Sequence, residues 1–564
     1  MDATDLLERP DARDPAALWQ DAMAHHGQRR FAAAGRCCAA IVAACPRHFD
    51  ALHLLGFCLM QEGRHAEAVP PLRRALALNP RFAPAHFNLG VALSRMDLLD
   101  EAIACFDRAI ALKPDYARAH NNRGTALRRC ARHDDALASF DRAIEADPHY
   151  GEAYSNRGIT LHDLHRLEAA LADLDMAVAL CPDAAAPHLN RGNVLKDLGR
   201  AAEALASHDR AVACDPAWPD AHAARGNALT DLNRLDAALA AYDAALAVAP
   251  GHPNATWNKS LALLAAGDLA GGLALYEVRE GKQASQGLRV FYQPEWTGAQ
   301  DLAGQTLFVY WEQGLGDTIQ FCRFARLAAA RAGRVVLSVQ EPLVGLLRQL
   351  APEVEVIGGS RAPAAFDYHI ALMSLPRALG LAGAPIPAPP AYLQAPAAEA
   401  AAWAERLGAA TRPRIGVAWT GNPLHRNDRQ RSMTLAALAP LAGLDAEWVC
   451  LHKEFRLHDR HALADWPGLR VPGAQLGDFS DTAGLVANLD LVVTVDTSVA
   501  HLSAAMGVPT WVMLPYAPDW RWMLERRDSP WYPAIRLFRQ PEPGDWASVV
   551  AEVAAQCAAW LPAR

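Results

Sequence analysis

The sequence has few lysines, no strong net charge and no long apolar run. Only five of its 54 basic residues are lysine, and the formal net charge is −8 over 564 residues. This balance gives no basic surface for nucleic acid and no polybasic segment for a membrane. No apolar run reaches the roughly 20 residues that a membrane span requires. The amino terminus, MDATDLLERPDARD, is acidic and does not resemble a secretory signal peptide, so we expect a cytoplasmic protein.

The sequence contains cysteines, but their spacing matches no known metal-binding or disulfide motif. The eleven cysteines are scattered, and none forms a CxxC pair. Zinc sites and disulfide frameworks need closely spaced cysteines, so we expect reduced thiols and no metal. A metal site at Cys37 and Cys38, which lie near His25, His26 and His48 in the sequence, is the alternative to small core residues there.

A repeat of 34 residues fills the first half of the chain. Its columns are proline at 46, 80, 114, 148, 182, 216 and 250, glycine at 56, 90, 124, 158, 192 and 226, and alanine at 75, 109, 143, 177, 211 and 245. A bulky residue lies three positions before each alanine: Leu72, Phe106, Phe140, Leu174, His208 and Tyr242. This is the signature of the tetratricopeptide (TPR) repeat, in which small residues let two antiparallel helices approach and proline ends the second. We expect an α-solenoid over 15–286, with six full repeats from about 49 to 252 and degenerate capping units at both ends.

A row of asparagines follows the first helix of the repeats. Asn88, Asn122, Asn156 and Asn190 each lie two residues before the repeat glycine, Asn258 continues the row, and Ala224 interrupts it. Evenly spaced amides can hydrogen-bond an extended peptide backbone without reading its side chains. The row therefore predicts a groove for a protein substrate. The alternative is that the amides only cap or solvate the helix surface.

After about residue 287, short apolar runs alternate with helical stretches. Strands are expected at 306–311, 334–340, 354–358 and 367–372, and, beyond the proline-rich linker 385–396, at 414–419, 447–453, 490–495 and 509–515. Helices are expected at 319–332, 434–442, 480–488, 498–506 and about 545–560. Two successive βαβ sets predict two Rossmann-like domains, 287–395 and 396–564, that face each other across a cleft.

Two loops at the carboxyl ends of expected strands carry the candidate chemistry. EQGLGDT (312–318) has two glycines that permit close approach of a substrate, and its Asp317 opens a helix. DTSVAH (496–501) also opens a helix, whose free N–H groups and dipole suit a diphosphate. The alternatives are an ordinary helix cap at Asp317 and a well-capped helix with a satisfied buried His501.

With these motifs, residues from about 300 to 545 resemble the heptosyltransferase family (glycosyltransferase family 9), which has the GT-B fold. The family's glycine–aspartate pair aligns with Gly316-Asp317, and its DTGxxH motif aligns with 496–501, where Ser498 replaces the glycine. The chain is also similar to bacterial TPR-fused glycosyltransferases, including those that modify flagellin, and its asparagine row is similar to that of the O-GlcNAc transferases. The resemblance implies Asp317 as general base and a last helix that packs back on the amino-terminal domain. It implies donor diphosphate binding by Asp496, Thr497, Ser498, Val499 and His501.

An inverting glycosyl transfer needs a base for the acceptor hydroxyl and positive potential at the leaving diphosphate. Glu312 is the fallback base, and Gly314 and Gly316 give the diphosphate room. No DxD motif occurs after residue 290, so cations are expected in place of a metal. The candidates are Lys453, the only lysine of this half, and Arg431, in the basic loop 420–432. Asp519 and Trp520, in PDWRWM, are candidates for binding the sugar, with core packing as the alternative for the tryptophan.

The sequence thus predicts an α + α/β protein, a TPR α-solenoid followed by a GT-B type pair of Rossmann-like domains. The predicted activity is metal-independent inverting transfer of a sugar from a nucleotide donor to a Ser/Thr hydroxyl of a protein such as flagellin. Two alternatives stay open. One is a TPR adaptor with a non-catalytic sugar-nucleotide domain, and the other is a glycosyltransferase acting on lipid or polysaccharide.

Overall fold

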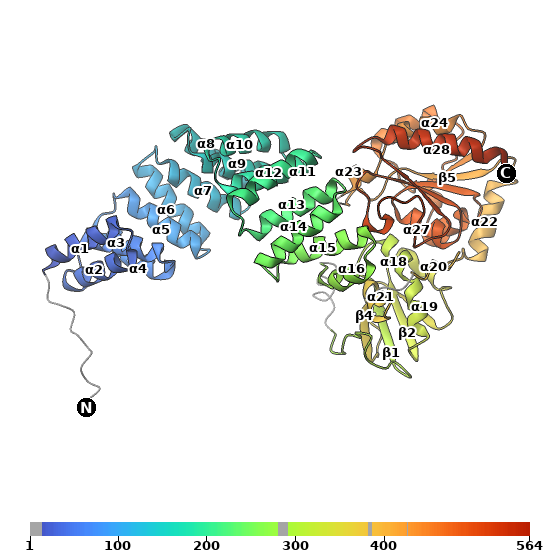
Figure 1. Ribbon diagram of the computed structural model, residues 1–564, viewed down its shortest axis with the longest axis horizontal. Helices are drawn as coiled ribbons and strands as arrows, with labels where there is room; N and C mark the ends of the chain where they lie inside the picture. Colours follow the sequence, from blue (N-terminus) through green and yellow to red (C-terminus); the bar gives the residue numbers. More distant parts are fainter. Residues whose placement is uncertain (1–13, 280–290, 382–385, 426, 564) are drawn as a thin grey trace. The chain divides into compact units, whose positions relative to one another are not determined.

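The computed structural model describes residues 14–279, 291–381, 386–425 and 427–563 (Figure 1). The chain forms two compact units, Met1–Ala217 and Trp218–Arg564. The division between them lies within the repeats, so the last two helix pairs belong to the same unit as the sheets. The domain boundary expected at 286/287 lies outside the described residues.

The first unit consists of six antiparallel helix pairs. They are α1 (Pro15–Gly27) with α2 (Phe31–Ala44), α3 (Phe49–Gln61) with α4 (His65–Leu78), α5 (Ala83–Arg95) with α6 (Leu99–Leu112), α7 (Ala117–Arg129) with α8 (His133–Ala146), α9 (Gly151–Asp163) with α10 (Leu167–Leu180), and α11 (Ala185–Asp197) with α12 (Ala201–Cys214). Each second helix ends two residues before the repeat proline, because proline disfavours helical backbone in the residue before it and cannot continue the hydrogen bonding. The prediction of TPR repeats is confirmed.

The repeat glycine packs against the bulky residue of the second helix. A Cβ at Gly90 would lie 2.7 Å from the ring of Phe106, and one at Gly124 would lie 2.6 Å from the ring of Phe140. Both rings are fully buried, so a methyl group at either glycine would push the helices apart. In the sixth pair His208 takes the place of the phenylalanine, and both of its buried ring nitrogens lack a hydrogen-bond partner among the described residues.

A further position of the repeat, not used in the sequence analysis, lies in the turn between the two helices of each pair. Its residues have positive φ and recur every 34 positions: Arg29, Gly63, Asp97, Ala131, His165 and Gly199 in the first unit, and Asn233 and Gly267 in the second. Only three of the eight are glycine. The turn geometry is therefore imposed by the packing of the pairs, at a cost of about 1–2 kcal/mol for each residue that has a Cβ.

The second unit begins with two further helix pairs and continues into a parallel sheet. The helices are α13 (Pro219–Asp231), α14 (Leu235–Val248), α15 (Pro253–Ala266) and α16 (Leu269–Leu275). The strands are β1 (Thr306–Tyr310), β2 (Arg334–Val339), β3 (Val354–Gly358) and β4 (Tyr368–Ala371), in the order β3-β2-β1-β4. The register places Phe308 of β1 beside Val336 of β2 and His369 of β4. The helices beside this sheet are α18 (Leu315–Phe321), α19 (Arg323–Ala329), α20 (Val344–Leu347) and α21 (Leu375–Ala378).

A second sheet, also entirely parallel, follows. Its strands are β5 (Arg414–Ala418), β6 (Glu447–Cys450), β7 (Leu491–Val495), β8 (Thr510–Leu514) and β9 (Ile535–Arg539), in the order β6-β5-β7-β8-β9. The helices are α22 (Ala397–Leu407), α23 (Asp428–Arg431), α24 (Ala439–Ala442), α25 (Leu457–Ala462), α26 (Phe479–Val486), α27 (Ser498–Ala505) and α28 (Trp546–Trp560). All eight expected strands are present, whereas β9 and the helices α20, α21, α22, α23 and α25 were not predicted. The helix expected at 319–332 is divided into α18 and α19 at Cys322.

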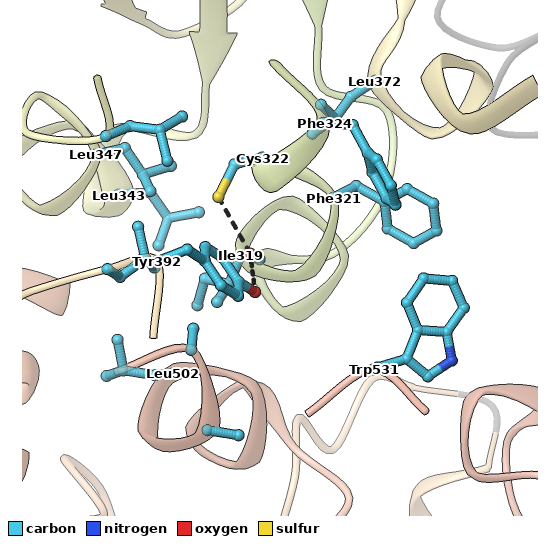
Figure 2. Packing of buried hydrophobic residues seen from close by; sticks show 14 of the residues in the cluster. Ile319, Phe321, Cys322, Phe324, Leu343, Leu347, Leu372, Tyr392, Leu502 and Trp531 are labelled. Atoms are coloured by element: carbon cyan, nitrogen blue, oxygen red, sulfur yellow. Dashed lines mark hydrogen bonds between the residues drawn. The ribbon is translucent and has the colours of Figure 1, made fainter. Parts of the chain in front are cut away.

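One continuous hydrophobic cluster spans both sheets, and it includes Val309 of β1, Ile319 of α18 and Leu502 of α27. Figure 2 shows its centre, where the Cys322 thiol and the Tyr392 hydroxyl both donate to the Ile319 carbonyl, at 3.1 Å and 2.9 Å. The two α/β halves therefore share a core.

The expectation that the last helix packs back on the amino-terminal domain is wrong. Val549, Val550, Val553 and Cys557 of α28 are buried in a separate cluster on the second sheet, together with Trp511 and Phe538. The short connection after β9 returns the helix to the sheet that the chain has just left.

Candidate functional site

Both candidate loops lie where the strand order of a sheet reverses. In the first sheet the 312–318 loop follows β1, which lies between β2 and β4. In the second sheet the 420–432 loop follows β5 and the 496–498 turn follows β7, and these two strands are neighbours. Parallel sheets bind ligands beyond the carboxyl ends of their strands at such points. The topology therefore selects the loops that the sequence motifs had indicated.

Asp317 lies in the first turn of α18. Its Oδ2 accepts a hydrogen bond from the backbone N–H of Gly314 at 2.8 Å, so the carboxylate caps the start of its own helix. Its Oδ1 accepts from the guanidinium of Arg521 at 2.5 Å. The side chain is 22% exposed, so it remains accessible although both oxygens have a partner.

Arg521 joins the two halves of the site, although no sequence motif pointed to this residue. Its side chain is 7% exposed and donates to Asp317, to Asp519 at 2.9 Å and to the side-chain oxygen of Gln320 at 2.6 Å. Burial opposes the charged guanidinium, but the Asp519 and Asp317 carboxylates outweigh it and raise the pKa of Arg521. In turn, burial raises the pKa of Asp519 but the charge of Arg521 prevails, and the net pKa is lowered. Both shifts favour the charged forms of Arg521 and Asp519.

Helices α18 and α27 cross at Gly316. A Cβ there would lie 2.9 Å from Cδ2 of His501 and 3.5 Å from Cα of Ser498. Glycine is therefore needed for the acid of the first loop to approach the start of the second helix. His501 itself is buried, with Nδ1 2.9 Å from the Tyr532 hydroxyl and its ring stacked on Trp522. Burial lowers the pKa of His501 to about 3, so it brings no positive charge to a diphosphate.

Arg431 reaches the end of β7, where it donates to the carbonyl of Asp496 at 3.2 Å. Burial and the negative charge of Asp519 raise the pKa of the Asp496 carboxyl, while Arg431 opposes this. Thr497 caps α27, since its hydroxyl accepts from the N–H of Val499 at 3.3 Å. The structure thus brings Arg431 to the start of the 496–501 segment, and the diphosphate role of these residues stays a prediction.

His425 is another candidate from the basic loop 420–432, in addition to Arg431. It lies in the loop after β5, and burial and Arg431 lower its pKa, while the charges of Asp519 and Asp317 oppose this. Arg426, in the same loop, lies outside the described residues. Lys453 is exposed in the loop after β6, and its ammonium donates a hydrogen bond to the carbonyl of Gly477 at 3.1 Å.

Two candidates are corrected by the structure. Glu312 has a fully buried side chain that accepts from Arg279 at 2.6 Å and 2.9 Å, so it is not available as a base. This ion pair joins the end of the helical repeats to the first sheet. Trp520 is 5% exposed, and its ring contacts Trp531, Tyr276 and, at 4.4 Å, the guanidinium of Arg521. Its faces are therefore not free to stack on a sugar.

The asparagine row divides into two kinds of residue. Asn88 is bonded to the His53 ring at 3.0 Å, and Asn156 donates to the side chain of Asn121 at 2.9 Å. Asn122 and Asn190 are half-buried and have no side-chain hydrogen bond among the described residues. Only Asn122 and Asn190 therefore have both the N–H donors and the oxygen acceptor of the side-chain amide free of other described side chains.

Within the described part of the chain, no three His, Cys, Asp or Glu side chains gather as metal ligands. Burial raises the pKa of Cys38 to about 12, and the side chain of His48 caps α3 by accepting from the N–H of Ala51. The helices that are described include none that could cross a membrane.

Comparisons with known proteins agree on the helical region. Models of the tetratricopeptide repeat match residues 59–123 and residues 20–81, 121–185 and 223–285. Protein FlbA of Caulobacter vibrioides is 28% identical over an alignment of 285 residues, which covers 46% of this chain. The chain covers 47% of FlbA, about half the length of this curated relative.

Solved structures with similarity to the chain include YrrB and MamA. YrrB, described as a TPR protein with an unusual peptide-binding site, is 26% identical and covers 34% of this chain and 98% of its own, with a TM-score of 0.29. MamA is 24% identical and covers 30% of this chain and 92% of its own, with a TM-score of 0.28. The matches to the repeat models show that the amino-terminal region contains TPR repeats, which in general bind peptides or proteins.

Proposed function

We propose that the protein is a metal-independent inverting glycosyltransferase of GT-B architecture. It moves a sugar from a nucleoside diphosphate donor to a Ser/Thr hydroxyl of a protein that the TPR repeats bind. The observation that supports this is the crossing of α18 and α27 at Gly316. The reaction requires a base close to a site that binds the donor diphosphate. The crossing brings Asp317 of α18 near the amino terminus of α27, which is the kind of helix end that binds phosphate.

In this proposal Asp317 takes the proton of the acceptor hydroxyl as the oxygen attacks the anomeric carbon. The bond from that carbon to the donor diphosphate breaks, and the diphosphate leaves with the electron pair. Arg431, Lys453 and the first N–H groups of α27 stabilise its charge. Arg521 acts as a positioning residue, since it holds Asp317 and Asp519 in fixed orientations. Flagellin is the acceptor to test first, on resemblance.

A TPR adaptor without activity is the second candidate. It is favoured by the two hydrogen bonds that already occupy both oxygens of Asp317. An adaptor would retain the helix crossing as a packing feature and would have no need for a nucleotide.

Isothermal titration of the full chain with UDP, GDP, ADP, CDP and dTDP separates the two. The enzyme proposal predicts a heat of binding with at least one of them. Arg431→Met should weaken that binding by about tenfold or more, because a charge-assisted contact to phosphate is lost. Arg429→Met is the matched control, since Arg429 is exposed in the same loop, and it should bind as the wild type does. An absence of heat with all five nucleotides would favour the adaptor.

A further inference from the structure

A cavity of about 340 Å³ lies beside the candidate site, within the second unit. One wall is the turn between α13 and α14, with Asn233, Leu235 and Asp236, and a second wall is the end of α15. The third wall is the segment after Trp522, with Met523, Leu524 and Glu525. The cavity therefore lies between the last repeats and the chain segment that carries Arg521.

The walls of this cavity are held in place. Asn233 donates to the carbonyl of Tyr516 at 2.6 Å, which fastens the repeat turn to the loop after β8. Met523 and Glu525 have φ values of 51° and 36°, a left-handed backbone that residues with a Cβ disfavour. Such a conformation persists only where its surroundings fix it, and such residues cluster at ligand sites. Here Arg539 donates to the carbonyls of Trp522 and Arg526 on either side of the segment.

The lining is apolar with a negative edge. Leu235, Met523 and Leu524 supply aliphatic surface, while Asp236 and Glu525 are exposed and have no ion pair among the described residues. The one cation of the lining, Arg526, is paired with Asp528 at 2.8 Å. A long aliphatic side chain with a terminal cation is complementary to this surface, because its stem contacts the leucines while its charge meets the carboxylates. The volume is at the small end of ligand sites and suits one such side chain.

We propose that this cavity binds a lysine side chain of the acceptor polypeptide. This inference rests on the proposed function and adds an acceptor preference to it. Leu524 follows Arg521 by three residues, and Arg521 holds the acid that faces the acceptor hydroxyl. Three residues span at most about 10 Å, and part of this segment is the short 3-10 helix Trp520–Trp522, so the cavity lies within that distance of the Arg521 backbone. The lysine therefore lies within about three to five residues of the modified Ser or Thr.

The test is a binding measurement that needs no transfer. Fluorescein-labelled peptides with one serine, and with lysine or norleucine three to five residues away, are titrated with the full chain and followed by anisotropy. The lysine peptide should bind about tenfold more tightly than the norleucine peptide at low salt. The double variant D236N/E525Q should abolish the difference, whereas Glu405→Gln, an exposed carboxylate on α22, should preserve it.

Three results would overturn the cavity proposal: equal affinity for the two peptides, no binding of the lysine peptide, or a preference that survives in the double variant. The two proposals fail separately. A lysine preference without sugar transfer would support the cavity and remove the enzyme, whereas transfer to both peptides alike would remove the cavity alone.

Discussion

Arg521 donates to Oδ1 of Asp317, and this hydrogen bond joins residues that are 204 positions apart in the chain. Asp317 follows the first strand of one sheet, and Arg521 follows the fourth strand of the other. A second nitrogen of the same guanidinium donates to Asp519. The ion-pair network of Arg521, Asp317 and Asp519 therefore includes residues from both halves of the α/β region.

Replacement of Arg521 should damage both stability and activity. Arg521→Met leaves two carboxylates without their buried partner, and breaking such a pair costs about 3–5 kcal/mol. We expect a lower urea midpoint for the full chain and loss of sugar transfer. Arg412→Met, at an exposed ion pair with Asp445, is the control and should change the stability by about 1 kcal/mol or less. Equal effects of the two substitutions would show that Arg521 has no special role.

Gly316→Ala should separate α18 from α27. The added methyl group would lie 2.9 Å from the His501 ring, inside van der Waals contact, and overpacking of this kind costs about 1–3 kcal/mol. Nucleotide affinity should fall with the stability. Gly443→Ala is the matched control, because nothing lies within 4 Å of a Cβ at that position. Unaltered calorimetric binding by the Gly316→Ala protein would contradict the account of the helix crossing.

His208→Phe should stabilise the repeats and change their pH dependence. Both ring nitrogens of His208 are buried without partners among the described residues, and each such group costs about 1–3 kcal/mol. Phenylalanine already occupies the equivalent place at Phe106 and Phe140.

The pH effect follows from the pKa of His208. Burial lowers this pKa to about 4, below the unfolded value of 6.5. Because the folded protein favours the neutral imidazole, the free energy of unfolding is highest above pH 6.5. It decreases as the pH falls from 6.5 toward 4. The urea midpoint of the variant should therefore exceed that of the wild type at pH 7.5, and by more at pH 5. A constant difference between the two pH values would refute the assignment.

The left-handed turns offer a test of backbone strain. Ala131 has φ 57° and Gly199 has φ 77° at equivalent places in two repeats. Ala131→Gly should stabilise the chain by up to about 1 kcal/mol, since the gain in the turn exceeds the added entropy of the unfolded chain. Gly199→Ala should destabilise it by a similar amount, because nothing lies within 4 Å of the new Cβ and only the backbone is affected. Thermal unfolding followed by circular dichroism measures both, and shifts of the same sign would exclude this explanation.

The asparagine row should respond unevenly to substitution. Asn122→Ala combined with Asn190→Ala removes two amides without internal partners, so it should weaken acceptor binding and leave stability nearly unchanged. Asn156→Ala leaves the Asn121 oxygen without its partner and should lower stability by about 1 kcal/mol. Anisotropy with a labelled acceptor peptide and urea unfolding distinguish the two effects. Loss of stability in the double variant, without loss of binding, would assign the row to structure alone.

The sequence predicted features that repeat or that follow a strand, and it missed those formed by distant contacts. The 34-residue repeat and eight of the nine strands in the described residues could be predicted, because each shows as a pattern along the sequence. The positive φ of the turn residues could not be predicted, because glycine occupies only three of the eight equivalent positions. The pairing of Arg521 with Asp317 had no local signal, and Trp520 looked like a ligand until its faces proved to be covered. Glu312 was misjudged because its partner, Arg279, comes from the end of the repeats.

The proposed transfer reaction is tested most directly by the intact mass of an acceptor protein. Flagellin is incubated with the full chain and a panel of nucleoside diphosphate sugars, and its mass is measured before and after. The account predicts an increase by one or more sugar residues with at least one donor, and a rate lower by about 10²–10⁴-fold for Asp317→Asn. An unchanged mass with every donor, from protein that binds the acceptor, would contradict it, and so would full activity of Asp317→Asn.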